Sequence, residues 1–464
     1  MVNGPTPLAA LDFERELQEL LREVGRLIVE YAYNRLEPEQ PEELPHHLDY
    51  DGQRYRRLNQ KTPNREVATL FGKITLQRHG YRHVERDVAE PTIFPLEQQL
   101  GLVEGATPAL AGEAARSLAE AGATQEVVLA RLRERHGVQW GVKKLRAVAA
   151  SVASSMEEHR REHQAQQVVE LLKQAQQSKG KNRPVLAVGR DGITLCTSPH
   201  SFYEVATTAT LTVYDRRGKR LGSVYLAYAP QLGQQQMTDE LTALIEEVLR
   251  RWEGPLPRLA YVTDAGDHES AYYRRVLKKL QHPTTGKRLK WQWIVDFYHA
   301  AQRLTVMAEA LFGVRHDKGR AAAAWAARMR KLLKKPNGPF RVLHAAAAMR
   351  GRCSMSASAS DKFQTAYNYL RTRTRHMQYA EFRRQGLPIG SGITEAACKT
   401  VFTQRLKLSG MRWSRPGAQT ILDLRVILLS GVWHTVYRAA VNTHQQRLPQ
   451  TPPSITSHRQ RQAA

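Results

Sequence analysis

Hydrophobic residues recur at helical spacing near the N-terminus and again over a central stretch. Residues 8–36 alternate Leu, Val and Ile with Glu and Arg, which predicts a long amphipathic helix. Residues 107–164 have the same period. Within them Thr124 is placed to cap one helix, Gly137 to break it, and a second helix is expected from near Trp140. The pattern therefore predicts a helical hairpin with a glycine turn.

Between these helical segments the period changes to two. Residues 37–47 (EPEQPEELPHH) are too rich in proline and acid for a helix or a strand. Residues 65–85 alternate apolar and polar side chains around Phe71-Gly72, which predicts a β-hairpin. One face of it either lies along a phosphate backbone or is simply solvated, and carries Arg65, Lys73, Arg78, Arg82 and His83.

The second half of the chain begins with strands. After a composition change at residues 176–184, three runs predict antiparallel strands, and then strand and helix alternate. This order predicts an α/β domain with one mixed sheet and helices on both faces, as in ribonuclease-H-like domains. Residues 300–385 have a helical pattern that no sheet domain requires. The sequence after Pro449 lacks acids and apolar periodicity, which predicts a flexible basic tail.

The excess of basic over acidic residues indicates which class of partner this protein binds. The 464 residues include 69 Lys and Arg against 44 Asp and Glu, a net charge of +25. Such an excess makes a polyanion the first partner to consider, although it also suits solubility alone. No run approaches the roughly 20 apolar residues of a membrane span, and the N-terminus lacks the order of a signal peptide. We expect a cytoplasmic, nucleoid-associated protein with no membrane partner, in which Cys196, Cys353 and Cys398 form neither disulfides nor a zinc cluster.

The predicted helical hairpin offers one site for DNA. Its second helix displays Lys143, Lys144 and Arg146, as a helix-turn-helix does when its second helix enters the major groove. The alternative is a helical hairpin whose basic face meets only water.

Four acids stand at predicted strand ends or at a helix start. Asp191 lies in VGRDGI, Asp264 ends RLAYVTD, Asp296 ends QWIVD, and Glu395 lies in GSGITEAACK. Side chains at strand ends converge at one edge of a sheet. Carboxylates gathered there favour Mg²⁺ or Mn²⁺, and a pair of such ions supports in-line phosphoryl transfer. The pattern therefore predicts a nuclease or a strand-transfer enzyme.

Each of these acids also has a structural interpretation. Asp264 or Asp267 is placed to cap the helix that follows, and Glu395 in a first turn is favoured by the helix dipole. Their joint placement in one fold pattern favours catalysis.

Five segments follow one another along the chain in an order that resembles a known family: VGRDG, YVTDAGD, WIVDFYHAAQRL, GSGITEAACK and QRLKLSGMRWS. Together they resemble the DDE transposases of bacterial insertion sequences, specifically the Kra-type group, which is similar to Mutator-like transposases. The resemblance covers most of the chain. It implies a ribonuclease-H-like catalytic domain with an all-α insertion, preceded by an α+β DNA-binding region. Asp191 is then the first acid of the triad, Asp264 the second (with Asp267 as the alternative) and Glu395 the third.

The resemblance also implies a role for each part of the site. The triad would hold two Mg²⁺ (or Mn²⁺) ions, so that water cleaves the element end and the freed 3′-OH attacks target DNA. Asp296 and His299 match a D-x-x-H motif, and His299 either orients a phosphate or is buried and bonded to Asp296. Trp413 either stacks on a base or belongs to the core. The residues expected to hold the DNA strand are Lys399, Arg405, Lys407, Arg412, Trp413 and Arg415.

We therefore expect an enzyme that cleaves element ends and joins them to target DNA, acting at least as a dimer when DNA is bound. The alternatives are an inactive DNA-binding protein (a repressor or scaffold) and a ribonuclease-H-like nuclease that cuts without joining. The expected parts are a helical segment (1–45), a hairpin region (46–105), a helix-turn-helix-like region (106–178), the catalytic domain in two pieces (179–299 and 389–445), the insertion (300–388) and the tail (446–464).

Overall fold

The computed structural model describes residues 6–85, 91–199, 202–314 and 316–446. Contacts divide the chain into two units. The first holds the described residues up to His159 and from His434 onward, and the second is Arg160–Trp433. The predicted basic tail lies outside the described residues, apart from Gln446.

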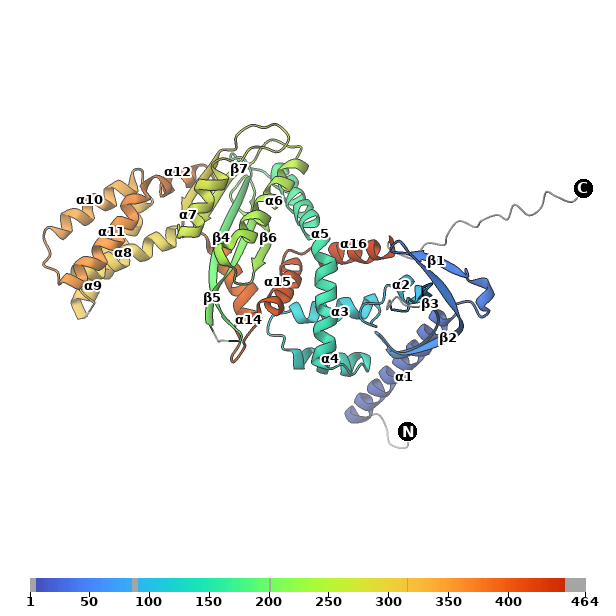
Figure 1. Cartoon of the computed structure of the whole chain (residues 1–464). Coiled ribbons are helices and arrows are strands. Elements are labelled where there is room, and N and C mark those ends of the chain that lie inside the picture. Colours follow the sequence, from blue (N-terminus) through green and yellow to red (C-terminus); the bar gives the residue numbers. More distant parts are fainter. Residues whose placement is uncertain (1–5, 86–90, 200–201, 315, 447–464) are drawn as a thin grey trace, which may run out of the picture. The chain divides into compact units, whose positions relative to one another are not determined.

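The first unit contains the long helix α1, the first part of the long helix α5, a small antiparallel sheet and short helices (Figure 1). The predicted amphipathic helix and hairpin are confirmed, but residues 37–47 are not irregular throughout, because they contain a 3₁₀ turn at Pro41–Glu43 and the start of the first strand. The elements are α1 (Pro7–Asn34), β1 (His47–Tyr50), β2 (Gln53–Thr69), β3 (Gly72–His83), α2 (Pro95–Gln99), α3 (Pro108–Ala119), α4 (Gln125–His136), α5 (Val142–Gln177) and α16 (Trp433–Gln446).

The predicted basic face of the hairpin is incomplete. Arg78 is buried, pairs with Glu97 at 2.5 Å, and has its guanidinium 3.7 Å from the centre of the Phe94 ring. His83 is buried as well. These two side chains therefore pack inside the unit, whereas Arg65, Lys73 and Arg82 are exposed.

The predicted helical hairpin is confirmed. Thr124 Oγ1 accepts a hydrogen bond of 3.3 Å from the Val127 amide and caps α4. Gly137 ends α4 with φ of 63°, a left-handed conformation that costs glycine little. The second helix is α5, which begins at Val142 and runs for 36 residues.

The boundary between the units differs from the predicted one at 176–184. It falls inside α5, because Val168 and Leu172 on the last turns of this helix are buried in the core of the second unit. At the other end, α16 belongs mostly to the first unit, where Tyr437 donates a hydrogen bond to the Pro108 carbonyl.

The second unit is built on a five-stranded mixed sheet of order β6-β5-β4-β7-β8. β4, β5 and β6 pair antiparallel, whereas β4, β7 and β8 pair parallel. The predicted α/β class with one mixed sheet is thereby confirmed. The elements are β4 (Val185–Thr197), β5 (Phe202–Tyr214), β6 (Arg220–Tyr228), α6 (Gln235–Arg251), β7 (Arg258–Thr263), α7 (Asp267–Tyr272), which continues as π turns to Leu277, and β8 (Trp291–Val295).

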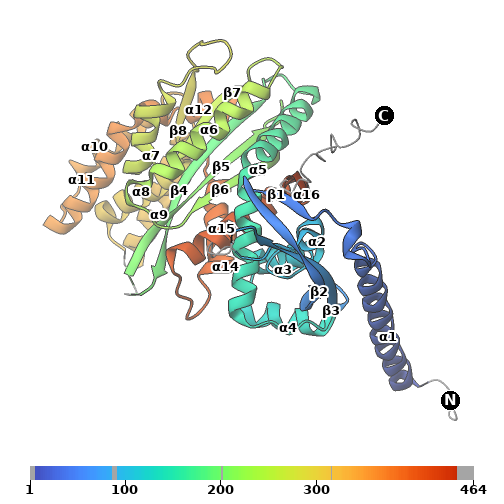
Figure 2. The ribbon, with the colours of Figure 1, turned by 45° about the vertical axis from the view of Figure 1, so that its right-hand side comes forward.

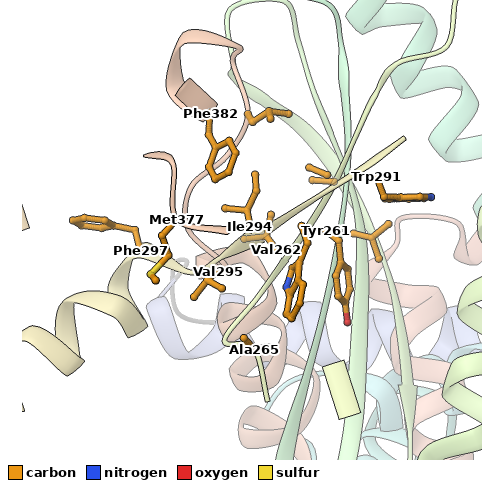
Figure 3. Close-up of a cluster of buried hydrophobic side chains, with 14 of the residues drawn as sticks. Tyr261, Val262, Ala265, Trp291, Ile294, Val295, Phe297, Met377 and Phe382 are labelled. Carbon is orange, nitrogen blue, oxygen red and sulfur yellow. The ribbon is translucent and has the colours of Figure 1, made fainter. Parts of the chain in front are cut away.

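Five helices and a 3₁₀ turn account for most of the described residues between Phe297 and Arg384, in agreement with the predicted helical pattern, and α8 to α11 pack on one another (Figures 1 and 2). Their core is continuous with that of the sheet. Figure 3 shows part of it, where β7 and β8 meet the end of the insertion through Val262, Ile294, Val295, Met377 and Phe382. The elements are α8 (Phe297–Phe312), α9 (His316–Leu333), α10 (Gly338–Arg350), α11 (Ala357–Thr372) and α12 (Tyr379–Arg384).

Three further helices follow: α13 (Gly392–Ala397), α14 (Gln404–Leu406) and α15 (Arg415–Leu429). Helix α13 lies against the sheet at Gly189 of β4. A β-carbon at this glycine would collide with Thr394 Oγ1, which lies 3.0 Å from Thr210 Oγ1 on β5. Gly189 therefore permits the close approach of α13 to the sheet. Among the described residues, no helix is long and apolar enough to cross a membrane.

We predict that Gly189→Ala lowers the free energy of unfolding by about 1–3 kcal/mol, because the added methyl group overpacks this contact. Chemical denaturation measures the loss. Gly392→Ala is the matched control, since a β-carbon there meets nothing within 4 Å, and it should change stability by about 0.5 kcal/mol or less. Equal stability of the two variants would contradict the close contact.

Candidate active site

The strand register aligns three of the predicted acids. The last parallel pair of β4 and β7 is Gly189 with Val262, so Asp191 and Asp264 each stand two residues beyond it. The last pair of β7 and β8 is Thr263 with Val295, so Asp264 and Asp296 each come next. Asp191, Asp264 and Asp296 thus stand at matching positions on three neighbouring strands, as expected for one edge of a sheet.

Asp191, the first acid of the predicted triad, is half-buried. Its Oδ1 accepts a hydrogen bond of 2.8 Å from the Gly192 amide, and the Cys398 thiol donates to Oδ2 over 3.4 Å. Burial raises the pKa of Asp191, and the negative charge of Asp264 raises it further. The two aspartates are therefore electrostatic neighbours.

Asp264 sits in a turn that the insertion holds in place. The turn contains Ala265 in a left-handed conformation, with φ of 63°. Tyr369 of α11 donates a hydrogen bond of 2.6 Å to the Asp264 carbonyl, and Arg373 donates one of 3.3 Å to the Ala265 carbonyl. The Gly266 amide donates to Asp264 Oδ1 over 2.9 Å. Two insertion residues that the sequence did not single out therefore position the turn that carries Asp264.

The alternative second acid, Asp267, has a different environment. It is the first residue of α7 and is exposed. The charge of Asp264, in contrast, raises the pKa of Asp191, Glu269 and Cys398. The geometry favours Asp264 as the acid that shares a site with Asp191.

Glu395 lies in the first turn of α13 and pairs with the predicted histidine. His299 Nε2 is 3.1 Å from Glu395 Oε1, and Ser391 Oγ, whose single proton goes to Asp296 Oδ2, lies 3.3 Å from the same Glu395 oxygen. The expectation of a buried His299 bonded through its side chain to Asp296 is wrong, because the ring is one-third exposed and contacts Glu395. Only the backbone amide of His299 bonds to Asp296.

Asp296 is fully buried and joins two helix starts. Its Oδ1 accepts hydrogen bonds from the amides of Tyr298 and His299 and so caps α8. Its Oδ2 accepts from both the amide and the hydroxyl of Ser391, the residue that precedes α13. Four donors satisfy a carboxylate that would otherwise be costly to bury. Asp296 therefore positions the helix that carries Glu395.

Glu269 is a further acid at the site that the sequence analysis missed. It lies on α7 and is buried. Burial raises its pKa to about 7, and the charge of Asp264 also raises it. A β-carbon at Gly266 would meet both Glu269 Oε2 and Asp264 Oδ1, so the two carboxylates border the same small space. Its sequence signal is an acid three positions before Tyr272, on the apolar side of a short helix.

The side chains at the site are of a type that binds hard divalent cations, but they lie too far apart to hold one. Asp191, Asp264 and Glu395 supply carboxylate oxygens, which Mg²⁺ and Mn²⁺ prefer. Burial raises the pKa of the Cys398 thiol well above its usual value. Within the part of the chain that the structure describes, no three His, Cys, Asp or Glu side chains gather closely enough to hold a metal ion. Binding would have to draw the carboxylates together.

The predicted DNA-holding residues divide into exposed and packed ones. Arg405 is buried, its guanidinium is 5.3 Å from the centre of the Trp413 ring, and burial lowers its pKa to about 10. Trp413 donates a hydrogen bond of 2.9 Å to the Leu406 carbonyl. Arg405 is thus wrongly predicted as a DNA contact, and the packed interpretation of Trp413 is favoured. The exposed cations are Lys399, Lys407, Arg412, Arg415 (paired with Glu204) and, on α5, Lys143 and Arg146, whereas Lys144 is half-buried.

Comparisons with known proteins add no family assignment. No protein-family model matches the chain, and a search of curated proteins finds no similar sequence.

We predict that Asp296→Asn lowers the free energy of unfolding by about 2–3 kcal/mol, because the amide leaves buried donors without an acceptor. Ser391→Ala should cost about 1 kcal/mol, since one hydroxyl is lost. Asp267→Asn, at an exposed acid, serves as the control and should stay within about 0.5 kcal/mol of wild type. Urea denaturation gives all three values, and a wild-type result for Asp296→Asn would refute the positioning role.

Glu269 should make stability fall with rising pH. Its pKa is raised from the usual 4.5 to about 7 in the folded chain, so the folded state holds a proton that the unfolded state has released. The stabilisation is complete below pH 4.5 and is lost as pH rises through about 7, a change of about 3 kcal/mol.

The measurement is the free energy of unfolding at pH 5 and pH 8 in buffer with EDTA. Glu269→Gln should flatten the dependence, and Glu253→Gln, at an exposed acid, should leave it unchanged. The same slope in wild type and Glu269→Gln would show that another group is responsible.

Proposed function

We propose that this chain is a DDE-type transposase, an enzyme that cleaves element ends and transfers their 3′-OH strands to target DNA. The observation that carries the proposal is the placement of Asp191 and Asp264 at one sheet edge, with the helix of Glu395 packed on the same sheet. Asp191 and Asp264 are neighbours at one edge of the sheet, and Glu395 is on a helix that lies against the strand of Asp191. Carboxylates in this arrangement suit metal-dependent phosphoryl transfer.

The fold supports the same proposal. Three antiparallel strands precede two parallel ones, and the strand that carries the first acid is central. This order fits a ribonuclease-H-like catalytic domain. The helical insertion also falls between Asp264 and Glu395, as the resemblance to Kra-type transposases implies.

Each side chain at the site has a proposed task. Asp191, Asp264 and Glu395 would hold the Mg²⁺ or Mn²⁺ ions, which when bound supply Lewis acidity to the attacking and leaving oxygens. His299 orients the Glu395 carboxylate through its 3.1 Å contact. In the first step, water attacks a phosphodiester at the element end, and the 3′ oxygen of the element strand leaves as a 3′-OH. In the second step, this 3′-OH attacks a phosphodiester of the target DNA, and the 3′ oxygen of the target strand leaves.

The distribution of charge supports DNA as the partner. Residues 300–388 contain 18 Lys and Arg against four Asp and Glu. On α9, Arg328 and Lys331 are exposed and lie three residues apart, on one side of the helix, and Lys335, just beyond its end, is exposed as well. A surface of this kind attracts a polyanion. We propose that the element ends and target DNA bind here and at the exposed cations near Glu395, that at least two copies act together, and that the protein works in the cytoplasm, on the nucleoid.

We predict that the purified chain with Mg²⁺ cleaves and joins duplexes that carry the inverted repeats flanking its own gene. Asp191→Asn and Glu395→Gln should each lower the rate by about 1,000-fold or more, equivalent to about 4 kcal/mol in the barrier. DNA binding should persist in both, with affinity falling at a log–log salt slope of about −0.9 per phosphate contacted.

Asp267→Asn is the matched control and should retain activity. Gel analysis of labelled ends separates the alternatives: cleaved but unjoined ends indicate a nuclease, and binding without cleavage indicates an inactive DNA-binding protein. Full activity in Asp191→Asn and Glu395→Gln would overturn the proposal.

A further inference from the structure

Helix α1 carries a heptad repeat on a face that the described chain leaves open. Its apolar side chains recur at alternating spacings of three and four, and Leu21 and Ile28 widen the stripe. This is the period of a coiled coil over three heptads. No residue of α1 is buried within the described chain, and the large apolar side chains of the stripe are 40% to 66% exposed. The stripe consists of Ala10, Phe13, Leu17, Leu20, Val24, Leu27 and Tyr31.

The opposite face of α1 already has its partner within the first unit. Gly25 lies against the Phe71 ring of the hairpin turn, and Val29 and Tyr33 pack on a small apolar cluster. Asn34 donates a hydrogen bond of 2.9 Å to the Thr75 carbonyl. The hairpin thus fixes the rotation of the helix about its own axis, and the heptad stripe is held facing outward.

Charge identifies the class of partner. Helix α1 contains six Asp and Glu against three Arg, in a chain whose net charge is +25. An acidic helix is repelled by DNA and by anionic lipid surfaces, which favour basic ones. The stripe therefore suits another protein surface.

We propose that α1 pairs with α1 of a second copy of this chain as a parallel, in-register, two-stranded coiled coil. The flanking glutamates favour the parallel direction. Glu16, Glu23 and Glu30 occupy the positions beside the seam, and an antiparallel pair would set glutamate against glutamate. A parallel pair sets Glu16 beside Leu21 and Glu23 beside Ile28 of the other copy. It also sets Glu30 beside Arg35 of the other copy, which has the opposite charge.

Contacts within α1 also reduce the repulsion between copies. Arg26 forms ion pairs of 2.7 Å with both Glu23 and Glu30 on its own helix. The pairing would stand whether or not the chain transfers DNA strands. If it does, the coiled coil supplies the two copies that joining two ends requires.

The test is the mass of the full chain in solution, free of DNA and metal, by sedimentation equilibrium. Wild type should have the mass of two chains. Leu20→Glu combined with Leu27→Glu should weaken the dimer by about 100-fold or more, because two charges enter the seam. Leu8→Glu combined with Leu11→Glu is the matched control, since both residues are exposed on the same helix outside the stripe; this variant should remain dimeric.

Circular dichroism melts check that all variants are folded, so a monomer caused by unfolding is recognised. A wild-type chain that is monomeric would overturn the proposal, even if another protein is later found to cover the stripe. A folded Leu20→Glu/Leu27→Glu variant that stays dimeric would also overturn it.

A second measurement tests the direction. Leu17→Cys and Tyr31→Cys lie near opposite ends of the stripe, and in a parallel, in-register pair each variant should form a disulfide with itself under mild oxidation. An antiparallel pair would separate identical residues at both positions. Cross-linking in neither variant, above the background from the three native cysteines, would refute the parallel arrangement.

Discussion

The buried carboxylate of Asp296 joins parts of the second unit that are far apart in sequence. It directly follows β8, caps α8 and accepts two hydrogen bonds from Ser391, 95 positions later. Because a buried charge without donors is very costly, the two hydrogen bonds from Ser391 stabilise the folded arrangement in which α13 begins beside the end of β8. Asp296 therefore fixes the start of the helix that carries Glu395, and the contact of Thr394 with Gly189 and Thr210 holds the same helix on the sheet.

The helical insertion and the sheet share one hydrophobic core. The core of the insertion is continuous with that of β7 and β8, and Tyr369 and Arg373 bond to the turn that carries Asp264. Ala265 has a left-handed backbone conformation in that turn, which is unfavourable for a residue with a β-carbon. The insertion thus stabilises a strained turn at the point where Asp264 is held.

Local patterns were sufficient to predict most of the elements. Alternation predicted the strands around Asp191, and Thr124 and Gly137 marked the ends of α4 as the structure has them. The errors concern contacts between distant segments. Arg405 has the sequence signature of a DNA contact but is buried, and the partner of His299 was misjudged because the bond to Asp296 comes from its backbone. Glu269 was overlooked because its neighbour Asp264 is brought close only by a turn.

The thiol beside Asp191 bears on the choice of metal. Zinc is bound most strongly by thiolates, and it outcompetes magnesium at most mixed sites. Cys398 donates its proton toward Asp191, and burial with nearby carboxylates opposes its ionisation. A thiol that keeps its proton is a poor zinc ligand. Beside Asp191 the chain therefore places a buried thiol that adds bulk without adding charge, and in the metal site proposed above this thiol would offer Zn²⁺ a weaker ligand than a thiolate.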